Sequence, residues 1–408
     1  MSVNLQSNYR WYMLVLLTAT GTFVAAIPFS CMPVLFKEIS EDLGLSLVQI
    51  GTIWGIASLA GVFVSIIGGV VSDKFGVKFI LSIFCILVGI TGASRGLSNS
   101  FLTLAVTVFI NGIVRLIIPI NLTKTIGLWF KGPNLGIAMG ISAMGMGLGL
   151  MLGPMLSATV LSPWLGGWRN VMYLYGAISV IVGIIWFLFG REPPQVESTT
   201  GYPRTEPFRQ TLLRLLRLKP LWLLGFVLLF RSAGIQGMTG YLPLYLRGEG
   251  WPAAGADGTL ATFYAASTAC VVPLTLLSDR LGSRKAILLP ALIVTFIFMS
   301  LIPFVNSFTI WAFIALSGAF FDGFMAITTT MLLETEGVGP VYSGTALGIV
   351  FTIAQVGSVI SPPLGNSFAS INPGLPFIFW AVLSGMALVT LAFIKETGKG
   401  RKNLSRVS

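Results

Sequence analysis

The sequence of 408 residues contains no histidine, few charged residues (10%) and only three cysteines. Without histidine there is no imidazole for a proton relay, for most zinc sites or for a Ser-His catalytic triad. The cysteines are odd in number and lie in or beside apolar runs, which indicates small packed residues and not a disulfide framework. We therefore expect no metal site, no cofactor and no enzyme.

The scarcity of charged residues also indicates whether most of the chain is surrounded by water or by lipid. A soluble domain carries about 25% charged residues, so a chain with 10% charged and 55% hydrophobic residues cannot cover a water-soluble globule of this length. About 20 apolar residues span the hydrocarbon core of a bilayer. We therefore expect an all-α integral membrane protein with twelve transmembrane helices in the lipid bilayer. The expected spans are 12–34, 48–71, 77–96, 101–126, 134–161, 168–190, 220–246, 258–278, 285–305, 308–333, 343–365 and 373–394.

The distribution of Lys and Arg over the connecting loops predicts the orientation. Most of these residues fall on the side that holds both termini, and only Lys37, Arg95, Arg169 and Arg247 fall on the other. Positive loops stay in the cytoplasm, which places both termini there in a multi-pass protein of the inner (cytoplasmic) membrane. The net charge of +11 then lies beside an anionic leaflet and requires no nucleic acid.

One long polar segment, rich in Pro, Ser, Thr and Arg, divides the chain into two halves of six spans. We predict an N-terminal six-helix bundle over 1–190, a cytoplasmic linker over 191–219 that ends in a surface helix, and a C-terminal six-helix bundle over 220–408.

The two halves repeat each other at a nearly constant offset. Asp73 after span 2 corresponds to Asp279 after span 8, and Gly112 in span 4 corresponds to Gly318 in span 10, each 206 residues apart. Two repeats of parallel topology are typical of secondary transporters, whose substrate site lies near the midplane between the repeats.

The loop after span 2 reads Gly69-x-x-x-Asp73-Lys74-x-Gly76-x-Lys78. It resembles the loop signature of the major facilitator superfamily, G-x-x-x-D-R-x-G-R-K. The resemblance implies a transporter fold of two pseudo-symmetric six-helix bundles that works by alternating access, and a monomer.

The loop after span 8 carries the second copy of this signature, and Gly149-x-x-x-Gly153-Pro154 in span 5 resembles the Gly-Pro motif of the same superfamily. The charged loops by themselves predict helix capping and cytoplasmic loops, whereas the resemblance implies a conformational latch on the cytoplasmic side. The expected latch residues are Asp73, Lys74, Lys78, Asp279, Arg280 and Arg284.

Span 5 is rich in glycine, which two interpretations explain. Small residues let membrane helices approach closely, so tight packing alone accounts for the glycines. Pro154 frees a backbone carbonyl and permits a bend, so Gly153 and Pro154 are equally a candidate hinge for alternating access and a hint of antiport.

Three ionisable residues fall in the middle of predicted spans: Arg115 in span 4, Arg231 in span 7 and Asp322 in span 10. Each costs about 2.5–3.5 kcal/mol to insert, so each faces a cavity or a partner. A structural ion pair between Asp322 and one arginine leaves the other arginine unpaired. This surplus of positive charge favours an anionic substrate, because the planar guanidinium binds a carboxylate through two hydrogen bonds.

Helical spacing adds neighbours to these charges. Residues four, seven or ten positions apart lie near one face of a helix. Asn111 therefore joins Arg115, whereas Met238 and Tyr241 join Arg231, with Gln236 less aligned. The resemblance to the organic-anion-carrying members of the superfamily is partial, because they often carry a further arginine in span 1.

We therefore expect a secondary active transporter for a small organic anion, a mono- or dicarboxylate, driven by protons or by exchange, with Asp322 as the coupling residue. The alternative within the superfamily is a drug or amphiphile efflux antiporter. Its support is the Gly-Pro motif and an interior rich in Met and Phe, but cation exporters need unpaired intramembrane acids. A membrane enzyme or a channel lacks support, because the sequence has no catalytic constellation and a channel needs no pair of latches.

Overall fold

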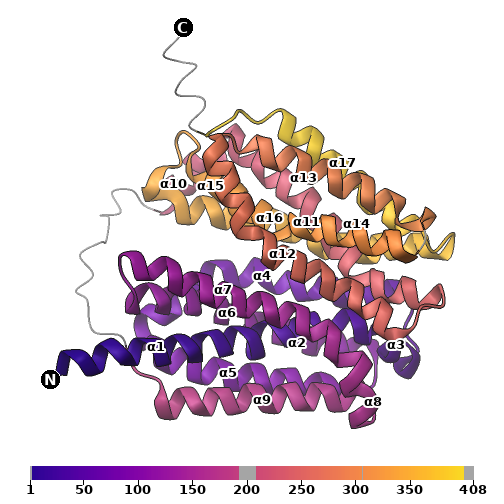
Figure 1. Ribbon diagram of the computed structural model, residues 1–408, viewed down its shortest axis with the longest axis horizontal. Helices are drawn as coiled ribbons and strands as arrows, with labels where there is room; N and C mark the ends of the chain where they lie inside the picture. The colour runs from indigo at the N-terminus through magenta and orange to yellow at the C-terminus, as the bar shows by residue number, and fades with distance from the viewer. Residues whose placement is uncertain (1, 193–207, 306, 399–408) are drawn as a thin grey trace, which may run out of the picture. The chain divides into compact units, whose positions relative to one another are not determined.

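The regular structure of this chain is helical throughout the part that can be described (Figure 1). The computed structural model describes residues 2–192, 208–305 and 307–398, with side chains at 9–61, 76–132, 134–192, 210–305, 308–338 and 342–398. This confirms the predicted all-α fold.

The first repeat contains six long helical stretches, several of them divided by short π- or 3₁₀-helical turns. Their bounds are α1 (Ser2–Thr20), η1 (Gly21–Ala26), α2 (Ile27–Ser30), α3 (Met32–Leu43), α4 (Leu47–Phe75), α5 (Val77–Ser94), η2 (Arg95–Leu97), α6 (Phe101–Trp129), α7 (Pro133–Leu156), η3 (Ser157–Leu161), α8 (Ser162–Leu165) and α9 (Trp168–Phe189).

The second repeat follows the same order after a short amphipathic helix, α10, which matches the surface helix predicted at the end of the linker. The bounds are α10 (Phe208–Leu216), α11 (Lys219–Gly248), α12 (Ala253–Leu281), α13 (Lys285–Leu301), η4 (Ile302–Phe304), α14 (Ser307–Ala319), α15 (Phe321–Leu333), α16 (Gly339–Ser367), η5 (Phe368–Ser370) and α17 (Leu375–Ala392).

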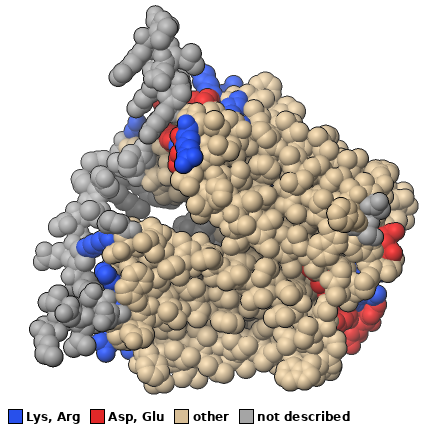
Figure 2. Space-filling model, in the orientation of Figure 1, with Lys and Arg blue, Asp and Glu red and all other residues tan. Residues whose placement is uncertain are grey.

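Eleven of the helices with described side chains are long and apolar enough to cross a membrane, and a shorter apolar helix, Leu47–Gly61, is the described part of α4. Each of the twelve predicted spans coincides with one of these helices. Charged side chains gather near the helix ends on the visible face, and the surface between them is largely uncharged, as a lipid-facing surface requires (Figure 2).

The helices group into two compact units. The first comprises Met1–Glu197 and Leu242–Ala261, and the second comprises Ser198–Tyr241 and Thr262–Ser408. Each has its own apolar core, which includes Trp186 in the first unit and Phe324 in the second. The predicted bundles over 1–190 and 220–408 and the linker over 191–219 remain predictions.

The internal repeat appears as equivalent packing within each unit. A Cβ atom on Gly112 of α6 would lie 2.9 Å from the Cβ atom of Ala60 on α4. A Cβ atom on Gly318 of α14 would lie 2.2 Å from the carbonyl oxygen of Phe263 on α12. The two glycines at an offset of 206 residues thus let span 4 approach span 2, and span 10 approach span 8.

In each repeat, a glutamate that follows the last span in sequence caps the start of the third span. Glu192 accepts hydrogen bonds from the backbone N–H groups of Val77 and Lys78 at the first turn of α5. Glu396 accepts from those of Arg284 and Lys285 at the first turn of α13. A carboxylate at a helix N-terminus satisfies free N–H groups and interacts favourably with the helix dipole.

Candidate functional site

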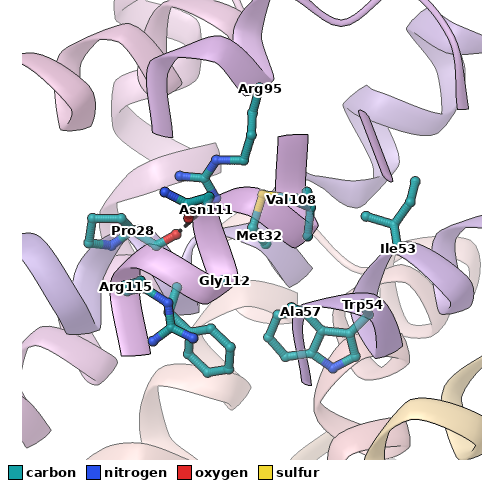
Figure 3. A pocket seen from close by; sticks show the side chains of 11 residues that line it. Pro28, Met32, Ile53, Trp54, Ala57, Arg95, Val108, Asn111, Gly112 and Arg115 are labelled. Carbon is teal, nitrogen blue, oxygen red and sulfur yellow. Dashed lines mark hydrogen bonds between the residues drawn. The ribbon is translucent and has the colours of Figure 1, made fainter. Parts of the chain in front are cut away.

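Helix α6 carries two of the predicted site residues to one cavity of the first unit. The helix begins with a capping box, in which Ser100 Oγ accepts from the backbone N–H of Thr103 at 3.3 Å. Asn111 and Arg115 follow on one face and both line the cavity (Figure 3). Asn111 is buried and donates to Val88 O at 3.2 Å and Thr91 Oγ1 at 3.0 Å, which fixes its side-chain amide.

Arg115 lies on an aromatic wall of this cavity. Its guanidinium carbon is 4.4 Å from the ring centroid of Phe29, and Phe29 stacks on Trp54 with centroids 4.9 Å apart. Cation–π contacts of this kind stabilise a guanidinium group out of water. They leave its N–H groups free to donate to an anion, because an aromatic face accepts no directional hydrogen bond comparable to that of a carboxylate.

A second arginine lines the same cavity, and sequence analysis placed it wrongly. Arg95 was counted as a cation of a loop, yet it is 3% exposed and faces the cavity from η2 (Figure 3). Its Nε donates to Gly92 O at 3.1 Å and its Nη1 to Pro28 O at 3.3 Å. The only signal in the sequence was the position of Arg95 within the last turn of an apolar run.

The remaining midplane charges lie in the second unit. Arg231 is 4% exposed, donates from Nη2 to Phe321 O at 2.8 Å and lies 4.3 Å from the ring centroid of Phe324. Asp322 accepts from Ser267 Oγ at 2.6 Å. Both charged side chains belong to the described part of the chain, and they form no ion pair with each other. The alternative of a structural Asp322–arginine pair is therefore not what this structure contains.

The neighbours predicted for Arg231 lie on the same helix, α11. Met238 is 1% exposed, and Gln236 is half-buried. Tyr241 is buried, donates to Pro373 O at 3.2 Å and packs on Phe377 with ring centroids 5.7 Å apart. In this structure the Tyr241 ring is thus part of an aromatic cluster within the second unit.

The second copy of the loop signature forms a network at the helix ends. Arg284 pairs with Asp279 at 2.5 Å and with Glu334 at 2.7 Å. The hydrogen bonds from Glu334 and Asp279 raise the pKa of Arg284 against the opposing effect of its burial. Arg280 is exposed. Within the predicted latch, Arg284 is therefore the cation that Asp279 binds.

The first copy is described only in part. Asp73 and Lys74 lie outside the residues whose side chains are described. The Nζ atom of Lys78 lies 6.0 Å from the ring centroid of Phe187, and its backbone N–H donates to Glu192. The latch role of all these residues remains a prediction.

Three glycines of span 5, Gly145, Gly149 and Gly153, lie where α7 approaches the first span. A Cβ atom on Gly153 would lie 2.1 Å from Ser30 Oγ, and one on Gly149 would lie 2.8 Å from Thr22 O. Just after Pro154 the helix widens into the π-helical turn η3. The close approach accounts for both glycines by packing, and the hinge at Gly153 and Pro154 remains a prediction.

The first unit also contains a buried ion pair that sequence analysis missed. Arg247 Nη2 lies 2.5 Å from Asp257 Oδ2, with 8% and 1% of the two side chains exposed. Thr159 Oγ1 donates to the same carboxylate oxygen at 2.9 Å. Thr159 belongs to the first sequence repeat and the ion pair to the second, so these bonds join residues from both repeats. Arg247 was assigned to a loop, and Asp257 lies at the boundary of a span.

Comparison with known proteins identifies the family. The profile of the Major Facilitator Superfamily matches residues 18–265 and 254–407. A probable sulfoacetate transporter of Cupriavidus necator is 26% identical over 405 residues, covering 91% of each chain. A cis,cis-muconate transport protein of Acinetobacter baylyi is 24% identical over 408 residues, covering 95% of each chain.

Among solved structures, an inward-facing and unoccupied bacterial homologue of the human lysosomal transporter Spinster superposes with a TM-score of 0.72 at 19% identity, covering 95% of each chain. This likeness supports the fold, and the family profile extends over nearly the whole chain. The chain therefore belongs to the major facilitator superfamily and is a multi-pass membrane transporter, not an enzyme.

Proposed function

We propose that this protein is a secondary active transporter that moves a small organic anion, a mono- or dicarboxylate or a related sulfonate, across the membrane by alternating access. The observation that carries the proposal is one cavity lined by two arginines, Arg95 and Arg115, and by no acid among the side chains described there. One buried and one half-buried guanidinium group, with no acid at the cavity wall, favour an anionic guest. The relatives named for sulfoacetate and muconate support the same substrate class.

The substrate-binding residues follow from the charges and their neighbours. We expect Arg115 and Arg231 to bind the anion through their guanidinium groups, and Asn111 to supply a polar contact in the cavity of the first unit. Around Arg231 we expect contributions from Tyr241, Met238 and Gln236.

For coupling we propose Asp322, the acid predicted at the midplane. Its carboxylate is held by Ser267 Oγ at 2.6 Å, so a change in protonation at Asp322 alters a defined hydrogen bond. Proton coupling and anion exchange are separated by whether a proton gradient drives uptake, and Asp322→Asn is expected to abolish that drive while anion binding persists.

We further propose that the protein acts as a monomer in the cytoplasmic membrane, with both termini in the cytoplasm. The bias of Lys and Arg between alternate loops supports this orientation.

Uptake into proteoliposomes tests the function. Purified protein is reconstituted, and uptake of radiolabelled carboxylates and sulfoacetate is measured with and without an inward proton gradient, and with and without internal unlabelled anion. Saturable uptake of an organic anion, lost in Arg115→Ala, is the expected result. Transport of a cationic dye with no transport of any anion would instead establish the efflux alternative.

A further inference from the structure

Arg95 has one nitrogen that its protein contacts do not use. Nε and Nη1 donate to the carbonyl oxygens of Gly92 and Pro28. The Nη2 atom is buried and has no hydrogen-bond partner among the described residues. A buried N–H donor without an acceptor destabilises the fold, and more so when it belongs to a charged group. The two carbonyl oxygens therefore account for the Nε and Nη1 atoms of Arg95, but not for its Nη2 atom.

The guanidinium group of Arg95 lies beside Asn111 at the wall of the cavity that Arg115 also lines (Figure 3). Both guanidinium groups belong to the wall of this one cavity. Like charges in a poorly solvated cavity repel strongly, and none of the side chains described at its wall is an acid. The cavity is therefore built for a guest that brings negative charge.

The size of the cavity limits that guest. Its volume is about 20 Å³, which exceeds the 10–15 Å³ or so that one water-sized group needs. It is far smaller than a whole organic anion. The cavity therefore accommodates one charged end of a substrate, and the remainder lies outside it.

We propose that Arg95 is a substrate-binding residue that holds one anionic end group, a carboxylate or sulfonate, of a short dianion. The proposal rests on the proposed function, because it assigns a subsite within the same anion site. One anionic end group in the cavity meets two guanidinium groups, so a monoanion leaves one positive charge uncompensated, whereas the second charge of a dianion, outside the cavity, compensates it. The substrate class is thus a compact molecule with two negative charges, and Arg95 sets the preference for the second charge.

The test compares ligands that differ only in charge. Binding to the purified full-length protein is measured by calorimetry for sulfoacetate and for dicarboxylates of three to six carbons. Each is paired with the monoamide in which one carboxylate is neutral. The wild-type protein is expected to bind at least one dianion tenfold or more tightly than its monoamide. Arg95→Gln is expected to bring the two affinities within about twofold, because the dianion loses more affinity than the monoamide.

A second pair of variants keeps the test decisive if Arg95→Gln does not fold. A Cβ atom on Gly92 would lie 3.5 Å from Arg95 Nη2 and 3.6 Å from Asn111 Nδ2, which is ordinary contact. Gly92→Asp therefore offers Arg95 a tethered carboxylate and is expected to weaken dianion binding at least tenfold. Gly92→Ala is the matched control and should stay within twofold of the wild type.

The outcomes separate this proposal from the proposed function. If the wild-type protein binds anions with no preference for two charges, or if both Arg95→Gln and Gly92→Asp retain the preference, Arg95 only caps helix ends and the inference is overturned. If the wild-type protein neither binds nor transports any of the anions, the proposed function fails and the inference fails with it. Lys37→Gln, which removes a cation outside the cavity, should change neither affinity.

Discussion

At the scale of single residues, the two midplane arginines differ in how much protein structure depends on them. Arg115 is held by the Phe29 ring, whereas Arg231 also donates to the Phe321 carbonyl. We predict that Arg115→Ala lowers anion affinity at least 100-fold with little change in melting temperature. Arg231→Ala should lower affinity similarly and also destabilise the protein by about 1.5–3 kcal/mol, since it removes a hydrogen bond from a charged group to the part-buried Phe321 carbonyl.

Binding calorimetry and thermal melts in detergent measure both effects. Arg115→Lys should restore less than a tenth of the lost affinity, because an ammonium group cannot replace the two-pronged guanidinium. Normal binding by Arg115→Ala would remove this residue from the site.

The sequence identified Arg115 and Arg231 because each interrupts a long apolar run, where the cost of burying charge signals a function. Arg95 was not recognised as a site residue from the sequence, for a physical reason. A cation in the last turn of a predicted span usually extends to the interface, and only the folded chain brings Gly92 O and Pro28 O to its guanidinium group. Asp257 likewise became visible only with the Arg247 contact.

Glu396 gives a prediction about pH at the same scale. Its partial burial raises the pKa, but hydrogen bonds from Ser283 Oγ and from backbone N–H groups, including that of Gly398, outweigh burial and bring the pKa to about 2. The folded-state pKa lies below the unfolded value of about 4.3, so Glu396 stabilises the fold above that value and the effect is lost as pH falls toward 2. Glu396→Gln should therefore lower the melting temperature at pH 7 more than at pH 3.

Melts of Glu396→Gln across this pH range measure the effect, and Glu41→Gln, at an exposed position of α3, is the control. An equal loss of stability at both pH values would mean that the carboxylate charge is irrelevant.

At the scale of elements, the sequence predicted the helices well because each apolar run has the length of a membrane span. It did not predict how they are divided, such as the break between α14 and α15 at Phe320. The glycines of span 5 were assigned two roles, and the contacts explain one of them. Gly153 lies against Ser30 and Ile27, whereas a Cβ atom on Gly140 would meet nothing within 4 Å.

This difference predicts opposite effects of the same substitution. Gly153→Ala should destabilise the protein by about 1–3 kcal/mol through overpacking. Gly140→Ala should be neutral or stabilise by up to about 1 kcal/mol, because alanine is the better helix former. Thermal melts in detergent compare the two variants directly. Equal stability would show that α7 can move away from α2 at no cost.

At the scale of the whole molecule, the repeat was the most informative feature of the sequence, since it predicted two six-helix halves of parallel topology. Gly112 and Gly318 each permit one close helix approach, and Glu192 and Glu396 each cap one helix. What the repeat could not predict is asymmetry. Arg95 and the Arg247–Asp257 pair occur once each, and each has one partner far away in the sequence, Pro28 and Thr159 respectively.

The Arg247–Asp257 pair bears on alternating access. Its hydrogen bond to Thr159 joins residues from the two sequence repeats at the helix ends that the charge bias predicts to be extracellular. In a superfamily member this end must open during transport, so we expect the Thr159–Asp257 hydrogen bond, which joins the two repeats, to break. Asp257→Ala removes the acceptor of both bonds and is therefore expected to favour the outward-open state.

Cysteine labelling measures that shift in a background with Cys31, Cys85 and Cys270 replaced by serine. Asp257→Ala should speed labelling of Tyr245→Cys at least threefold and slow labelling of Thr329→Cys, because one end opens as the other closes. Glu249→Ala, which removes an exposed acid near the same helix end, should change neither rate. Faster labelling at both positions would indicate a loosened or channel-like protein, and an unchanged pair of rates would mean that the buried ion pair stabilises both states equally.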